Sequence, residues 1–311
     1  MYQYIVRRLL LTIPVIIGVS IIVFAIIRMI PGDPARAIAG VNATPEFIQQ
    51  VRVRYALDQP FYVQYGRFMA DLFRGDLGRS IFSGRAVTTE IGERFPRTLV
   101  LASVALVIAT GIGVSAGIVS ATRRNSLFDN ASMVVALAGV AAPVFWMALM
   151  LQLLFAVQLR WLPATGIGTF RHIILPSITL GTASAALMAR ITRSSMLDVL
   201  RQDFITTARS KGLGERVVVY KHALKNALIP VVTVLGLQFG ILLGGAVLTE
   251  TVFAWPGVGR LLVDAILRRD YPVVQGTVML LAFLFVIINL VVDVVYAYLD
   301  PRVHYQSGSG E

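Results

Sequence analysis

The sequence predicts an all-α polytopic membrane protein with six transmembrane helices. Of its 311 residues, 56% are hydrophobic and only 14% are charged, and the mean hydropathy is +0.74. Soluble domains carry about 25% charged residues, and a soluble protein of this length needs a polar shell that so few charges cannot supply. We therefore expect most of the apolar surface to face lipid.

Six apolar stretches are long enough to cross a bilayer, which takes about 20 residues. They are residues 9–30, 98–122, 133–158, 173–193, 227–250 and 272–298. The fourth is the weakest, because it is short and rich in Gly, Ser and Thr. The first follows Arg7-Arg8, as a signal peptide would, but its apolar run is too long for one and no small-residue cleavage site follows. We expect an uncleaved anchor.

Positive charge orients these spans, because Lys and Arg concentrate in cytoplasmic loops. The same rule accounts for the net charge of +11 without a nucleic-acid partner. Every lysine lies in the loop 194–226, so we expect this loop and both termini to be cytoplasmic. Residues 31–97 then form an external insertion, since long segments translocate largely regardless of charge.

The chain is expected to be one membrane domain over residues 1–305. Residues 306–311 resemble a linker scar. Within the external insertion, residues 44–57 and 60–73 have helical apolar spacing. The insertion is too small for a large core of its own, so we expect it to pack on the membrane domain.

Catalytic and nucleotide-binding motifs are missing from the sequence. The three histidines lack metal-ligand spacing, and no Gly-Lys pair exists for a phosphate-binding loop. A stand-alone ion-coupled carrier would place ionisable groups at mid-membrane, whereas Arg28, Glu250 and Asp293 lie near the ends of spans. The sequence therefore predicts a non-enzymatic chain without cofactors that takes its energy from a partner.

Regular glycine spacing marks two of the spans. Gly236, Gly240 and Gly244 recur every four residues in the fifth span, and Gly113 and Gly117 do so in the second. Glycines on one helix face allow a neighbouring backbone to approach closely. Close helix packing is one interpretation of the fifth-span glycines, and a special role, lining a transport pathway or forming a seam with another subunit, is the other. Glu250 is likewise either a gate residue or a locally paired side chain.

The cytoplasmic loop contains a short amphipathic segment, 203–212. Phe204, Ile205 and Ala208 form its apolar patch, Arg209 and Lys211 its charged edge, and Gly212 a stop signal that tolerates positive φ. Such a helix is suited to docking in a groove on a partner protein. A basic helix lying on anionic lipid is the alternative.

At this loop the sequence resembles the membrane subunits of ATP-binding-cassette importers. Their motif is Glu-Ala-Ala, three residues, Gly, and a later return to the membrane at a Leu-Pro pair. Here Thr206-Thr207-Ala208, Gly212 and Ile229-Pro230 stand at these places, with two departures in the triplet and a longer stretch from Gly212 to Pro230. Further segments resemble the dipeptide, oligopeptide and nickel permeases: Ile30-Pro31-Gly32-Asp33-Pro34, Gly75-Asp76-Leu77-Gly78, Phe253-Ala254-Trp255-Pro256-Gly257, Arg269-Asp270-Tyr271-Pro272 and Asp300-Pro301-Arg302.

This resemblance implies an importer in the bacterial inner membrane. The chain would be the first of two permease subunits and would work with two ATPases, which bind ATP and Mg, and with a periplasmic substrate-binding protein. The coupling helix would comprise Asp203, Phe204, Ile205, Thr206, Thr207, Ala208, Arg209, Lys211 and Gly212. The implied substrate is a dipeptide, an oligopeptide or glutathione. Nickel import and a stand-alone secondary carrier are the alternatives.

Overall fold

The computed structural model describes residues 2–29, 33–39, 43–54 and 57–299. The linker scar expected at 306–311 lies outside them. Contacts divide the chain into two compact units. Unit 1 comprises Met1–Ile5, Leu99–Trp255 and Ile287–Glu311, and unit 2 comprises Val6–Thr98 and Pro256–Val286. Within the described ranges the regular elements are helices. One isolated antiparallel β-bridge pairs Arg79 with Ala86.

Among the described residues, four helices are long and apolar enough to cross a membrane. They are α5 (Val87–Thr122), α8 (Arg171–Val199), the continuous helix Glu215–Val252, and the part Tyr271–Val292 of α13 (Tyr271–Leu299). The first expected span forms α1 (Tyr2–Met29), whose described apolar part is Leu10–Ala25. The all-α polytopic class is confirmed, and the count of six spans stays a prediction.

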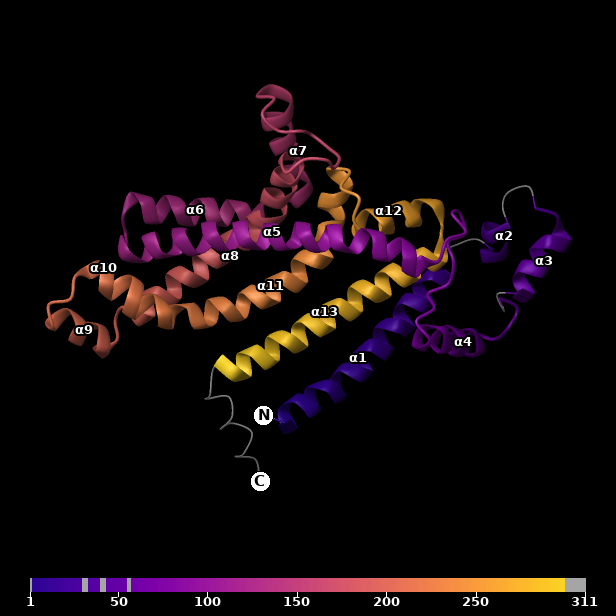
Figure 1. Cartoon of the computed structure of the whole chain (residues 1–311), viewed down its shortest axis with the longest axis horizontal. Coiled ribbons are helices and arrows are strands. Elements are labelled where there is room, and N and C mark those ends of the chain that lie inside the picture. The colour runs from indigo at the N-terminus through magenta and orange to yellow at the C-terminus, as the bar shows by residue number, and fades with distance from the viewer. Residues whose placement is uncertain (1, 30–32, 40–42, 55–56, 300–311) are drawn as a thin grey trace. The chain divides into compact units, whose positions relative to one another are not determined.

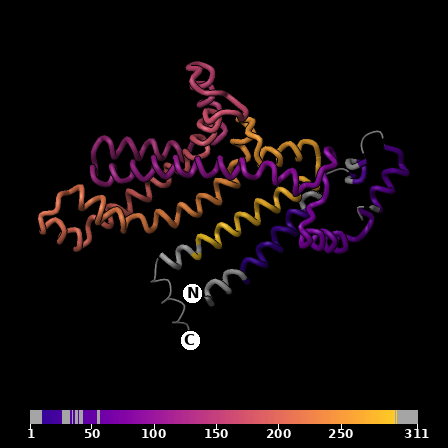
Figure 2. The backbone as a smooth tube through the Cα atoms, in the orientation of Figure 1, coloured from indigo at the N-terminus to yellow at the C-terminus, as the bar shows by residue number. Residues whose placement is uncertain are grey.

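The third expected span, 133–158, is not one straight helix. It forms α6 (Leu127–Ala141), α7 (Val144–Leu151) and the π-helical turn η1 (Gln152–Gln158), with a bend of 108° between α6 and the following pair. Figure 2 shows α7 standing steeply away from α6. The break lies at Ala142-Pro143, where Ala142 is extended with ψ 128°, because a residue before proline is driven out of the α region.

The expected cytoplasmic loop, 194–226, is much shorter in the structure. Helix α8 continues to Val199, six residues past the expected end at 193. After α9 (Asp203–Ser210), helix resumes at α10 (Glu215–Val217) and runs through the π-helical turn η2 (Val218–Ala223) into α11 (Leu224–Val252). The fifth expected span and the segment before it therefore form one helix, since no glycine or extended residue interrupts 215–229 and Pro230 is accommodated within α11.

Glycines allow α5 and α8 to touch backbone to backbone in unit 1. A Cβ added at Gly113 would lie 2.6 Å from the carbonyl oxygen of Ala185, and one at Gly117 would lie 2.7 Å from that of Ala189. The approach is reciprocal, because a Cβ at Gly181 would lie 2.8 Å from the carbonyl oxygen of Ala105. Close packing is thus the role of this glycine pair, and we call these contacts the α5–α8 seam. Helix α8 also packs against α6 and α11 (Figure 1).

The insertion in unit 2 contains α2 (Pro34–Ala39), α3 (Pro45–Arg54) and α4 (Phe61–Phe73). Helix α4 packs against α1, where the Phe24 ring lies 5.1 Å from Phe61 and 5.3 Å from Tyr65. The Tyr65 hydroxyl also lies 2.7 Å from that of Ser20. The expectation that the insertion packs on the membrane domain is confirmed at this contact.

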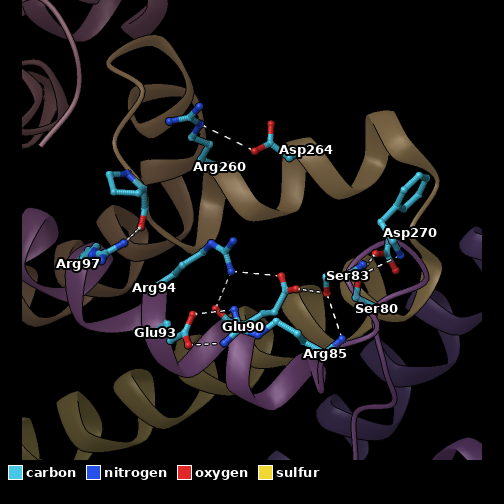
Figure 3. Close-up of polar contacts among 12 residues, drawn as sticks. Ser80, Ser83, Arg85, Glu90, Glu93, Arg94, Arg97, Arg260, Asp264 and Asp270 are labelled. Carbon is cyan, nitrogen blue, oxygen red and sulfur yellow. Dashed lines mark hydrogen bonds and ion pairs between the residues drawn. The ribbon is translucent and has the colours of Figure 1, made fainter.

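A polar cluster joins the end of the insertion to the start of α13 in unit 2 (Figure 3). The buried carboxylate of Asp270 accepts hydrogen bonds from Ser80 Oγ at 2.5 Å and from the Ile81 amide at 3.2 Å. A cavity of about 260 Å³ lies beside these groups, between the segment 80–94 and α12 (Val258–Arg268). The segments Gly75–Gly78 and Arg269–Pro272, far apart in the sequence, are therefore neighbours: a Cβ added at Gly78 would lie 3.6 Å from Pro272 Cβ.

Candidate coupling site

Helix α9 is eight residues long and has two unlike faces. Ile205 and Ala208, one turn apart, are buried, with 0% and 7% of their surfaces exposed. Phe204 and Thr207, also one turn apart, are exposed together with Asp203, Thr206, Arg209 and Lys211. The sequence correctly placed a short amphipathic helix here, and the structure shows which side of it is turned inward.

The buried face of α9 packs on the ends of several long helices. Ile205 and Ala208 belong to one apolar cluster with Met196 and Val199 of α8, Ile118 and Ala121 of α5, and Val218, Val219, Ala223 and Ala227 of the η2–α11 helix. Burying an isoleucine of this kind contributes about 1.5–3 kcal/mol. Ser195 Oγ donates to the carbonyl of Ala227 at 2.9 Å, which fixes α8 to α11 beside the cluster. Figure 1 shows α9 and α10 at one end of these helices.

This arrangement corrects the expected apolar contact surface. The sequence predicts that Ile205 and Ala208 contact a partner, but both are used within the chain. The three residues spread over about 100° of the helix circumference, and the cluster takes the two on its inner side, which are spaced three apart. Phe204, with 39% of its surface exposed, is the apolar residue of the predicted patch that remains open.

Gly212 ends α9 as the sequence predicted. Its φ is +79°, a conformation that side-chain-bearing residues rarely adopt. The Leu213 amide donates to the carbonyl of Ala208 at 3.4 Å, which satisfies one of the free carbonyls at the helix end. The chain thereby reverses direction within a few residues and starts α10 at Glu215.

An exposed ion pair closes this reversal. Arg209 Nη2 donates to Glu215 Oε1 at 2.7 Å and Nε donates to Oε2 at 3.2 Å. This hydrogen bonding raises the pKa of Arg209 above its ordinary value, so the guanidinium stays charged. An exposed pair contributes at most about 1 kcal/mol, and its main effect is to orient α9 against α10.

A second ion pair near this site was missed by the sequence analysis. Asp129, at the start of α6, accepts hydrogen bonds from Arg193 of α8 at 2.6 and 2.8 Å. Its Oδ2 also accepts from the Asn125 amide at 3.0 Å, and only 1% of the Asp129 side chain is exposed. The one available signal was an acidic residue among apolar ones, and nothing in the sequence indicated a partner 64 residues away.

The fifth-span glycines do not act alike. A Cβ at Gly236 would lie 2.4 Å from Val292 Cγ2, so this glycine allows α11 and α13 to pack closely. Gly240 is buried, whereas Gly244 faces open space and is exposed. Glu250 is fully buried near the end of α11. Between these residues, Gln238 donates to Ser184 Oγ of α8 at 3.2 Å, a buried polar contact that the sequence analysis did not predict.

Long apolar helices that pack on one another, with one short amphipathic helix fixed to their ends, are the architecture of an integral membrane protein. The model of the binding-protein-dependent transport system inner membrane component matches residues 113–305, and the N-terminal model of the same systems matches residues 1–102. The chain belongs to this family, and the resemblance to importer permeases is confirmed.

Curated relatives match along the whole chain. It is 50% identical to the dipeptide transport system permease protein DppB of Alkalihalophilus pseudofirmus, over 98% of this chain and 100% of that protein. It is 49% identical to the glutathione transport system permease protein GsiC of Escherichia coli O6:H1, with the same coverage. Among solved structures, the MetNI methionine ABC transporter shares the fold, with a TM-score of 0.57 and 19% identity over 68% of this chain and 96% of that one.

Proposed function

We propose that this chain is a permease subunit that imports short peptides, with a dipeptide or glutathione as substrate. The observation that carries the proposal is the identity of 49–50% to a dipeptide and a glutathione permease over 98% of the chain. Nickel import is not favoured by these relatives. The proposed assembly adds a second permease subunit, two ATPases that hold ATP and Mg, and a periplasmic binding protein. This chain itself would need no cofactor.

The substrate class is tested by uptake into vesicles that contain the assembled transporter. We expect the binding protein and ATP together to drive accumulation of a labelled dipeptide or labelled glutathione, and unlabelled peptide to compete. Nickel ions should not compete. Uptake of nickel with no uptake of either peptide would contradict the proposal.

The proposed route of energy is α9. Its inner face is fixed to the ends of α5, α8 and α11, so a force on its outer face reaches all three helices. Its outer face offers Phe204, Thr207 and Lys211, spaced as one helical stripe. An ATPase groove that receives this stripe would move the long helices directly.

Phe204→Glu should uncouple the transporter. An unpaired charge at a buried protein contact costs about 2–5 kcal/mol, so we expect the ATPases to dissociate or uptake to fall at least about tenfold. Phe204→Leu keeps an apolar side chain and is the control, with near-normal uptake. Ala208→Glu is not a suitable test, because Ala208 lies in the chain's own core. Normal assembly and uptake by Phe204→Glu would show that α9 is not the docking element.

The proposed orientation places α9 in the cytoplasm and the insertion outside. The chain contains no cysteine, so single cysteines report topology cleanly. Ser210→Cys in α9 and Tyr62→Cys in α4 replace exposed residues. We expect an impermeant maleimide to label position 62 in intact cells and position 210 only in inverted vesicles. Labelling of both from one side would overturn this orientation.

A further inference from the structure

An apolar cavity of about 370 Å³ opens between α5, α6 and α8 in unit 1. Its walls include Ile112 and Ala116 of α5, Val135 and Gly139 of α6, and Thr182 and Ala186 of α8. Side chains here are small, aliphatic or, at Phe128, aromatic, and the few polar ones are hydroxyls. Cavities of this size and composition hold apolar ligands.

One end of the cavity is bordered by positive charge. On α8, Arg190 follows Ala186 by four residues, so it lies one turn further along the same face. On the other side, Arg123 and Arg124 follow the end of α5 and precede the cavity residue Phe128. All three arginines are exposed. Asp129, the buried acid at this end, is already engaged by Arg193.

We infer that this cavity binds the acyl chain of an anionic phospholipid, with the phosphate held by Arg124 and Arg190. The charge pattern fits this ligand, because basic pockets between membrane helices on the cytoplasmic side bind anionic headgroups. This end of the helices is the cytoplasmic one in the orientation proposed above.

The site is adjacent to the coupling elements. Arg190 lies three residues before Arg193, and the α5–α8 seam, through Gly113, borders the same cavity. A bound lipid would therefore fill the space between α6 and α8 next to the ion pair that joins them. The charge of a bound lipid headgroup would therefore lie next to the helices to which α9 is fixed.

The test is photolabelling of the complete transporter in nanodiscs. Phosphatidylglycerol and phosphatidylcholine, each with a diazirine in one acyl chain, are supplied at the same mole fraction, and labelled peptides are identified by mass spectrometry. We expect phosphatidylglycerol to label the cavity-lining residues more strongly than phosphatidylcholine. Arg124→Gln with Arg190→Gln should lower phosphatidylglycerol labelling about 10- to 30-fold, whereas Arg171→Gln, at the other end of α8, should not.

Filling the cavity gives an independent check. Ala136→Phe places a ring among the lining residues, while Val134→Phe adds the same ring on an exposed face of α6. We expect only Ala136→Phe to abolish labelling, with all variants eluting as intact complexes. Equal labelling by both lipids that the arginine changes do not alter would overturn the inference. So would cross-linking of Ala136→Cys to the second permease subunit, which would mean that a protein helix covers the cavity. Failure of this lipid proposal would leave the proposed function untouched, because vesicle uptake and cysteine labelling are measured separately.

Discussion

Asp129→Ala should destabilise the protein by about 3 kcal/mol. The substitution removes both hydrogen bonds that Arg193 makes and leaves a guanidinium whose side chain is only 26% exposed without its carboxylate. Breaking a buried ion pair from one side costs about 3–5 kcal/mol, and the partial exposure of Arg193 places this case at the lower end. The same change removes the acceptor for the Asn125 amide, so the start of α6 should loosen as well. Thermal unfolding of the detergent-purified complex measures the loss.

A double substitution separates this explanation from simple loss of packing. Replacing a buried ion pair by apolar residues is often neutral or stabilising, so Asp129→Leu with Arg193→Leu should recover most of the stability. Asp198→Ala, on an exposed part of α8, is the matched control and should change stability by less than about 0.5 kcal/mol. The explanation fails if the double variant is as unstable as Asp129→Ala, or if Asp129→Ala unfolds like the wild type.

Gly113→Ala should separate α5 from α8. The new Cβ would lie 2.6 Å from both Ala185 O and Met188 Cβ, closer than real Cβ contacts. One of these atoms is backbone, so the helix itself must move. Overpacking of this kind costs about 1–3 kcal/mol, and a larger side chain such as leucine should prevent assembly. We expect reduced yield of intact complex by size-exclusion chromatography and a lower melting temperature.

Gly111 supplies the control for this prediction. It lies two residues away on the same helix, is exposed, and has nothing within 4 Å of its Cβ position. Alanine is favoured over glycine within helices by about 0.8–1 kcal/mol, so Gly111→Ala should be neutral or slightly stabilising. The same chemical change should thus have opposite effects at the two positions. Equal effects would mean that helix propensity, and not the α5–α8 seam, decides stability here.

Local sequence features predicted the elements that depend on local chemistry. The apolar runs became long helices, the segment after Gln202 became α9, and Gly212 took positive φ because few other residues do. The bend at Pro143 was not predicted. The run 133–158 is apolar throughout, and this composition favoured one continuous span despite its single proline. Its signal was present in the Ala142-Pro143 pair, which disfavours helix at Ala142.

Contacts between distant segments could not be predicted in this way. Gly113 and Gly244 occur in similar four-residue patterns, yet one meets a backbone and the other meets open space, since the neighbouring helix decides. The inward face of α9 depends in the same way on the ends of α5, α8 and α11, which converge only in the folded chain. The link between Asp129 and Arg193 joins residues 64 positions apart, and a single sequence carries no sign of such a pairing.

Backbone contact along the α5–α8 seam has a mechanical consequence. The contacts extend from Ala105 and Gly181 to Gly117 and Thr192, so neither helix can roll or slide against the other without opening several turns at once. The pair is therefore stiff along its length. A 29-residue helix such as α8 is about 43 Å long. When a stiff helix of that length is tilted at one end, the whole helix tilts by the same angle. A few ångströms of movement at α9 would then become a comparable movement on the far side of the bilayer, without any rearrangement in between.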